Sequence, residues 1–435
     1  MINRIINNQK KILLEFKKSY KKKNYLNSFN YCSIGAQTLG AIYFKLTLEF
    51  RKNIINFIKV YFTEIYSLGL IKRISILNNF KNKKFEILIL NWAFKKDFKN
   101  YFFDKNFNIR SNKFGNILWV LLYLSNDLPK KIPKNALIIH IKKNKSFNFI
   151  NFLSNFLMIL KKKNFFIFKN LSQQVFLSIS INNLIKKKIK IFDSKKMYIT
   201  YESQLFQKNI IYELKKKYKR LKIIGYDHTA PQPLPINLFH DKYSPDFLIV
   251  NSKNKFDFNH KYLGWPKNKM KIMKSFRFRI IKKDFQLKIF LPYVLNDQET
   301  YIIKMINLMK ILKIKDLKSF KIKIHPACKK KIKHLNFIKK LKKLKNLEFK
   351  NNNKNKNNNI VVFLGQTTAI PIAIESKLDC YNICLDPNFD VYNPKIWSGI
   401  KCNEIDNNIY LYKLKKKKSL IWIDKEYNNF NKLKI

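Results

Sequence analysis

Two short polar segments follow successive apolar runs and carry residues capable of acid–base chemistry. The first is YESQ at 201–204, which precedes an amphipathic helical pattern, and the second is GYDHT at 225–229. A carboxylate beside an imidazole orients the ring and raises its basicity, as a general base requires. We therefore predict that Glu202 and His228 form a catalytic pair. The alternative is that Glu202 caps its helix and His228 bonds a loop carbonyl.

The segment KIHP at 323–326 could contact phosphate. Pro326 ends a β-like run, so His325 should lie at the carboxyl edge of a strand with Lys323 close by. A histidine or lysine in that position can bind a monophosphate or diphosphate. This pattern alone is only weakly specific for a phosphate site, and it becomes moderately specific together with the segment at 365–369.

The segment GQTTA at 365–369 also fits a phosphate site. Gln366, Thr367 and Thr368 follow an apolar run and open a helical pattern. Backbone N–H groups and hydroxyls at a helix N-terminus bind anions. Glu375, further along the same helix, could accept hydrogen bonds from ribose hydroxyls. Ordinary N-capping is the alternative for the two threonines.

Apolar runs that alternate with helical patterns must position these segments. The strand-like runs are 85–91, 136–141, 196–200, 222–226 and 246–251, and then 288–292, 320–325, 347–350, 360–365 and 380–385. Such alternation predicts parallel α/β sheets. Ligands of these sheets bind at the carboxyl ends of strands where the strand order reverses.

The two series of runs predict α/β architecture with two Rossmann-like domains and a helical N-terminal extension. Residues 1–280 would form the N-terminal domain with its extension, of which the first eighty residues have a mostly helical pattern. Residues 281–400 would form the C-terminal domain. Residues 401–435 would form a C-terminal tail.

The chain is strongly basic, with 89 Lys and Arg against 27 Asp and Glu in 435 residues, a formal charge of +62. Such a charge suggests nucleic acid or an anionic membrane surface. Lysine is nevertheless spread along the whole chain together with Asn, Ile and Phe, which an AT-rich coding background would also produce. No zinc-finger, RNP-type or basic-zipper pattern is present. We therefore expect no specific nucleic acid and favour anionic lipid headgroups.

The five cysteines match no metal-binding spacing, and we predict no metal site. The N-terminal twenty residues lack the apolar core of a signal peptide. The apolar runs 117–124 and 152–160 are too short to span a bilayer. The expected location is the cytoplasm, at the inner face of a membrane.

Taken together, the motifs resemble those of bacterial surface-carbohydrate glycosyltransferases. YESQ, IIGYDHT at 223–229, SPDFLIVNS at 244–252 and KYLGW at 261–265 are similar to segments of that group. KIHP and GQTTAIPIAIES resemble the C-terminal half of capsule, Kdo and sialic-acid-type transferases. The resemblance extends over about 195–400. Asp227 is a departure, because the family has Gln or a similar residue there.

The resemblance implies a metal-independent GT-B enzyme without a cofactor. Its partners would be a nucleotide-sugar donor and a saccharide or lipid-linked acceptor. His325, Thr367 and Thr368 would hold the donor phosphate, and the cations Lys323 and Arg277 would help to stabilise the leaving nucleotide.

Two other classes remain open from the sequence. A polymer-phosphate transferase of the glycerophospho type resembles the same C-terminal half. A non-catalytic basic protein that binds membrane or nucleic acid would account for the charge without chemistry.

Overall fold

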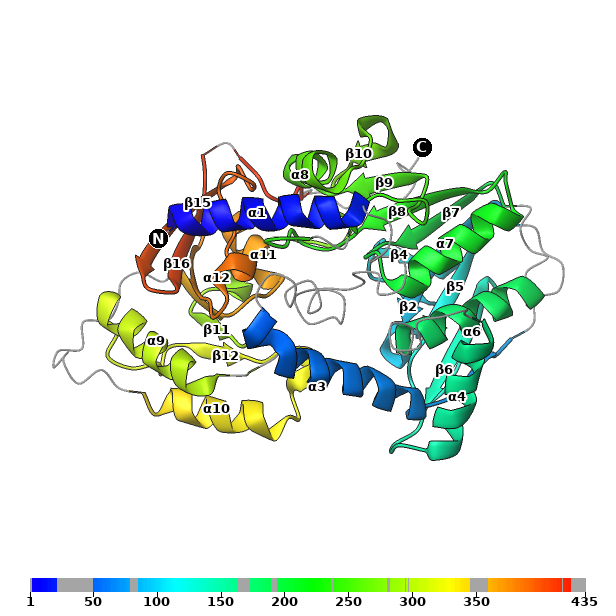
Figure 1. Cartoon of the computed structure of the whole chain (residues 1–435), viewed down its shortest axis with the longest axis horizontal. Coiled ribbons are helices and arrows are strands. Elements are labelled where there is room, and N and C mark those ends of the chain that lie inside the picture. Colours follow the sequence, from blue (N-terminus) through cyan, green and yellow to red (C-terminus); the bar gives the residue numbers. More distant parts are fainter. Residues whose placement is uncertain are drawn as a thin grey trace.

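The computed structural model describes residues 2–21, 50–78, 85–162, 173–188, 194–235, 238–279, 282–293, 295, 297–344, 359–416 and 418–423. The strand expected at 347–350 lies outside these ranges. The chain has a mixed α/β fold, and both of its larger sheets contain parallel strands (Figure 1).

The first sheet has eight strands in the order β1-β6-β5-β2-β7-β8-β9-β10. They are β1 (Ile71–Ile76), β2 (Ile87–Ala93), β5 (Ile117–Tyr123), β6 (Ala136–Lys143), β7 (Lys196–Thr200), β8 (Lys222–Asp227), β9 (Phe247–Val250) and β10 (Met270–Ile272). Only β1 is antiparallel to its neighbour. All residues of β5 are buried, as expected for a strand that is covered on both faces.

The strand order of this sheet reverses at β2. From β2 the chain proceeds to β5 and β6 on one side, and then returns to place β7, β8, β9 and β10 on the other side. The carboxyl ends of β2 and β7 are therefore the place where a ligand of such a sheet is expected.

Helices fill the connections of the first half. They are α1 (Ile2–Lys21), α3 (Phe50–Gly69), α4 (Phe149–Lys162), α6 (Gln173–Lys188), α7 (Leu205–Lys217) and α8 (Lys253–Leu263). Short 3-10 helices are η1 (Lys95–Asp97), η2 (Ser111–Lys113) and η4 (Lys267–Lys269), and β3 (Phe103–Asp104) pairs with β4 (Ile109–Arg110). Over the described part of residues 1–80 the expected helical pattern corresponds to α1 and α3, whereas 71–76 form strand β1.

The second sheet has six strands in the order β12-β11-β13-β14-β16-β15. They are β11 (Lys288–Phe290), β12 (Lys321–Lys323), β13 (Ile360–Leu364), β14 (Asp379–Ile383), β15 (Ile400–Asp406) and β16 (Ile409–Leu414). The first four in sequence are parallel, whereas β16 is antiparallel to β14 and β15. Its helices are η5 (Lys282–Asp284), α9 (Gln298–Ile311), η6 (Pro326–Cys328), α10 (Ile332–Lys342), α11 (Ala369–Glu375) and α12 (Pro387–Asp390).

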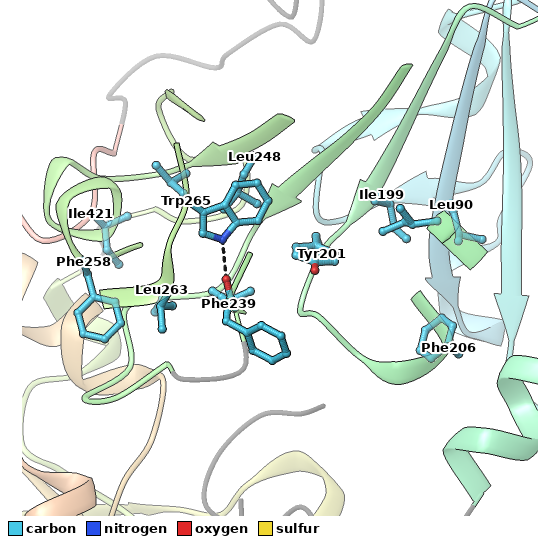
Figure 2. Packing of buried hydrophobic residues seen from close by; sticks show 14 of the residues in the cluster. Leu90, Ile199, Tyr201, Phe206, Phe239, Leu248, Phe258, Leu263, Trp265 and Ile421 are labelled. Atoms are coloured by element: carbon cyan, nitrogen blue, oxygen red, sulfur yellow. Dashed lines mark hydrogen bonds between the residues drawn. The ribbon is translucent and has the colours of Figure 1, made fainter. Parts of the chain in front are cut away.

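The prediction of a tail at 401–435 is wrong for its described part. Strands β15 and β16 complete the second sheet, with Ile400, Tyr410 and Tyr412 fully buried. Segment 418–423 then pairs with the first half, where Trp422 N donates to Asn251 O over 2.7 Å. Figure 2 shows Ile421 of this segment near Phe258.

The N-terminal helix also connects the two halves. Helix α1 crosses the upper half of the view below α8, with its N-terminal end near β15 and β16, and it contacts both α12 and α8 (Figure 1). Gln9 Nε2 donates to Val391 O at 2.7 Å. No helix in the described ranges is long and apolar enough to cross a bilayer.

Candidate functional site

The structure brings Glu202 and His228 together at the carboxyl edge of the first sheet. Thr200 of β7 pairs with Tyr226 of β8, and each candidate residue stands two positions beyond its strand partner. Both side chains therefore reach the same level on the same face. His228 Nε2 lies 3.2 Å from Glu202 Oε1, and the side chains are 7% and 15% exposed. The pair adjoins the strand reversal, because β7 is one of the two strands that form it.

A tight turn fixes the Glu202 carboxylate. Ser203 has a positive φ of 59°, an uncommon conformation for a residue with a side chain. Gln207 Oε1 accepts from Glu202 N at 3.0 Å and Gln204 N at 3.1 Å, and its Nε2 donates to Thr200 O at 2.7 Å. Gln204 Nε2 donates to Glu202 Oε2 at 2.8 Å. The N-cap of α7 is Gln204, so Glu202 does not cap that helix.

Nearby charges keep Glu202 ionised. Burial acts to raise the pKa of Glu202, but the hydrogen bond from His228, the charge of Arg277 and the hydrogen bond from Gln204 together lower it. The charge of Arg277 thus acts on Glu202, whereas the sequence grouped Arg277 with the residues expected to bind the donor phosphate. The local sequence could not indicate this interaction, because Arg277 follows β10, at the far end of the strand order.

The remaining ring nitrogen of His228 suits a general base. In the neutral tautomer that donates from Nε2 to the Glu202 carboxylate, Nδ1 carries a lone pair. Nδ1 is buried and has no hydrogen-bond partner in the described part of the chain. An unpartnered buried polar atom in a native protein calls for an explanation, and a role in proton transfer supplies one.

A buried ion pair supports the loop that carries His228. Lys255 Nζ lies 2.7 Å from Asp227 Oδ2, and both side chains are almost completely buried. Lys255 also donates to Thr229 O at 2.6 Å, and Asp227 Oδ1 accepts from the Thr229 hydroxyl at 2.6 Å. Burial lowers the pKa of Lys255, while Asp227 acts in the opposite direction. The acidic residue at 227, which departs from the family pattern, therefore has a structural partner on α8.

Aromatic residues of the second half bind the backbone of the Pro-rich segment that follows His228 in the chain. Tyr392 OH donates to Pro231 O at 2.8 Å, and Trp397 Nε1 donates to Pro233 O at 3.0 Å. Trp397 is itself stacked on Phe258 of α8. The His228 loop is thus fixed from both halves of the molecule.

A polar cluster lies at the strand reversal. Asn91 of β2 accepts from Thr200 Oγ1 at 2.9 Å and donates to Asp104 Oδ1 at 2.7 Å. Asn106 Nδ2 donates to Asn91 Oδ1 at 3.0 Å. Burial raises the pKa of Asp104, although its hydrogen bonds act against that rise. The polar end of the run at 85–91 was the available sequence signal for this cluster.

His325 and Lys323 lie at the exposed carboxyl end of β12, in the second sheet. The His325 ring makes an edge-on contact with Tyr293, at 5.1 Å between centroids. Partial burial and the charge of Lys331 lower the pKa of His325. Near neutral pH its imidazole is therefore mainly a hydrogen-bonding group rather than a cation.

The residues of GQTTA follow β13. Gly365 has φ 73°, and a Cβ there would lie 2.8 Å from Tyr301 OH, so the turn requires glycine. Thr367 Oγ1 accepts from Ala369 N at 3.3 Å, whereas the exposed Thr368, at the N-cap of α11, makes no side-chain capping bond. Gln366 is half-buried on the same turn.

The two donor-side segments do not follow adjacent strands. Strand β11 lies between β12 and β13, so KIHP and GQTTA are about 10 Å apart in the sheet direction. The order of this sheet reverses between β11 and β13, which places GQTTA at the second reversal point.

Glu375 has a structural environment that differs from the expected ribose contact. Its Oε1 accepts from Leu420 N, from Ile421 N at 3.0 Å and from Ser419 Oγ at 3.2 Å. Burial raises the pKa of Glu375, with these hydrogen bonds acting in the opposite direction. The carboxylate therefore fastens the C-terminal segment to α11.

Within the described ranges, no group of three or more His, Cys, Asp or Glu side chains could hold a metal ion. The cysteines at 328, 380, 384 and 402 are buried thiols, and burial raises the pKa of the last three.

Comparisons with known proteins give little further guidance. No family model matches the chain, and no curated protein is significantly similar to it. A solved structure, a glycosyltransferase from Rickettsia africae ESF-5, is similar at 12% identity over 69% of this chain and 79% of that chain, with a TM-score of 0.31. Likeness at that level leaves the function to be argued from the site itself.

Proposed function

We propose that this protein is a metal-independent glycosyltransferase that moves a sugar from a nucleotide-sugar donor to a saccharide or lipid-linked acceptor. The single observation that carries the proposal is the Glu202–His228 pair beside the strand reversal. The pair is close, buried and charged on one side, and it leaves His228 Nδ1 without a partner among the described residues. That arrangement suits removal of a proton from an acceptor hydroxyl.

In the proposed reaction the acceptor oxygen attacks the anomeric carbon of the donor. His228 Nδ1 takes the hydroxyl proton, and Glu202 stabilises the imidazolium that forms. The bond between the anomeric carbon and the phosphate oxygen breaks, and its electron pair leaves with the nucleotide. Atoms and charges balance without a cofactor.

We assign the donor phosphate to the second sheet. His325 would donate a hydrogen bond, Lys323 would supply charge, and Gln366, Thr367 and Thr368 would contribute polar groups from the turn after β13. Arg277, on the Glu202 side, would face the same phosphate from the first sheet. This arrangement corresponds to two Rossmann-like domains of GT-B type, with the acceptor on residues 1–280 and the donor on the second half.

We propose that the protein is located at the cytoplasmic face of a membrane, where a lipid-linked acceptor would be available. Surface lysines near an anionic leaflet contribute about 1 kcal/mol each. The chain's charge of +62 is compatible with such a location.

Calorimetric titration with CMP-, CDP-, UDP- and GDP-linked sugars tests the proposal. We expect one nucleotide class to bind the wild type, to bind His228→Gln equally and to bind His325→Ala more weakly. Lys329→Ala, an exposed lysine beside the KIHP segment, is the matched control. Absence of binding to every nucleotide would contradict an enzyme of this class and favour the non-catalytic basic protein. Turnover of a CDP-linked polyol instead of a sugar would identify the polymer-phosphate transferase.

A further inference from the structure

An uncovered apolar surface lies on α3 and α4, far along the sheet from the proposed catalytic pair. On α4 it comprises Phe149, Ile150, Leu153 and Leu157, and on α3 it comprises Ile58, Phe62 and Tyr66, with Phe147 between the helices. We call this set the α3–α4 face. Ile150 is 77% exposed and Phe149 is 65% exposed. In Figure 1 the end of α3 meets α4 at the lower right.

The spacing of these residues shows one continuous stripe on each helix. Positions 149, 150, 153 and 157 lie on one side of α4, and positions 58, 62 and 66 lie on one side of α3. The Tyr66 and Phe147 rings stack at 5.1 Å between centroids, and Phe147 continues to Phe152 at 5.8 Å. The two stripes therefore form one surface.

The opposite side of α4 is firmly anchored, so its apolar stripe is not an unpacked core face. Asn155 Nδ2 donates to Leu68 O at 2.8 Å and to Ile71 O at 3.0 Å. Ile159 on the same side is buried. The inner side of α4 is therefore packed and hydrogen-bonded, while its outer side is apolar. An apolar outer side is unusual for a helix that faces only water.

Basic residues lie at one end of this face, where 144–148 runs past the end of α3. Lys72 and Arg73 of β1 are exposed there, Arg73 pairs with Lys142 of β6, and Lys143 and Lys145 are also exposed just before Phe147. Between Asp127 and Asp193 the chain contains no acidic residue. Glu64 is the acidic residue in the described part of α3, and it accepts from Gln173 N at 3.1 Å on the side where α6 packs.

We infer that the α3–α4 face docks on an anionic phospholipid bilayer. The apolar and aromatic side chains of the face would enter the interfacial region of the bilayer. The basic residues at its β1–β6 end would contact lipid phosphates. A second copy of the chain fits less well, because symmetric contact would bring the two basic rims together. The inference deepens the proposed membrane-side location of the transferase, but its test does not depend on turnover, so either proposal can fail without the other.

Co-sedimentation with phosphatidylcholine vesicles, with and without phosphatidylglycerol, tests the inference. We expect wild-type protein to bind the anionic vesicles and to bind neutral ones much more weakly. Ile150→Glu combined with Leu153→Glu should lower the partition coefficient by at least about tenfold, because each change removes an apolar group from the interface. Both residues are exposed, so thermal unfolding of the variant should match that of the wild type.

Ile303→Glu is the matched control, since Ile303 is 58% exposed on α9 of the second half and lies outside the face. It should leave vesicle binding unchanged. Equal binding of wild type and the double variant would overturn the inference and leave charge alone as the cause. If the wild type binds neutral and anionic vesicles equally, the proposed contact of basic residues with lipid phosphates is wrong. Concentration-dependent dimerisation that the double variant abolishes, without vesicle binding, would assign the face to a second copy instead.

Discussion

The proposed catalytic pair of Glu202 and His228 gives the sharpest prediction, because two substitutions should separate its chemical and positioning roles. His228→Gln keeps a side-chain N–H that can donate to Glu202 but offers no basic ring nitrogen. Loss of general-base catalysis should reduce turnover by about 10²–10⁴-fold. Glu202→Gln keeps a hydrogen-bond acceptor for His228 Nε2 and removes only the charge.

The structure allows the second effect to be estimated. A hydrogen bond to a charged group contributes about 1.5–3 kcal/mol and a neutral one about 0.5–1.5 kcal/mol. The difference of about 1 kcal/mol corresponds to roughly fivefold in turnover. Gln204, which donates to Glu202 Oε2 at 2.8 Å, can rotate its amide to suit the new side chain, because its own Oε1 has no hydrogen-bond partner in the described part of the chain.

The assay is release of free nucleotide from the donor that calorimetry identifies, measured with saturating acceptor. Donor affinity should stay nearly unchanged in both variants, since the proposed phosphate contacts belong to the second sheet. If His228→Gln retains wild-type turnover in the folded fraction, the pair only supports its loop. If Glu202→Gln is as damaging as His228→Gln, the carboxylate has a direct chemical role that the 3.2 Å contact alone does not explain.

Four further outcomes follow from particular contacts. His325→Ala should weaken nucleotide binding by about 1.5–3 kcal/mol with little change in thermal stability, and the reverse result in paired titration and melting would make His325 structural. Glu375→Ala should lower the unfolding free energy by at least about 2 kcal/mol while nucleotide affinity persists, because three donors lose their acceptor. Lys255→Met should lower the free energy of unfolding, measured in urea, by about 3–5 kcal/mol, because it leaves Asp227 buried without its cation. Adding Asp227→Asn should recover part of that loss. If the effects of the two substitutions simply add, the two side chains are not coupled. The pKa of Glu202 is lowered in the folded state, so ionised Glu202 should stabilise the folded protein fully above pH 4.5, its ordinary pKa. That contribution should be lost as the pH falls through the lower pKa of the folded state. A difference in unfolding free energy between wild type and Glu202→Gln that stays constant across this acid range would contradict the prediction.

Local sequence pattern was sufficient to predict the strands that precede Glu202 and His228. The runs at 196–200 and 222–226 appear as β7 and β8 almost residue for residue, because continuous apolar sequence between polar turns suits a strand buried on both faces. Successive parallel strands are usually neighbours, so the proximity of Glu202 and His228 could be predicted from their positions after those strands.

The local sequence does not indicate how far apart the strands that carry KIHP and GQTTA lie in the second sheet. Strand β11 precedes both in the chain, yet it lies between them and pairs with both β12 and β13. Nothing in the local sequence of either segment records which strand will occupy the position between them. Strand order is decided by how helices pack across the complete sheet.

The sequence by itself determined the α/β class, the strands that precede Glu202 and His228, and the polar turns that follow those strands. These depend on side-chain periodicity and turn chemistry within a few residues. Only the tertiary structure decided that 400–414 completes the second sheet, that Lys255 neutralises Asp227, that the charge of Arg277 acts on Glu202 and that Glu375 binds the 419–421 segment. Each of these depends on contact between segments distant in the chain, and a charged or polar side chain acquires its partner, and therefore its role, only when burial removes water as the competitor.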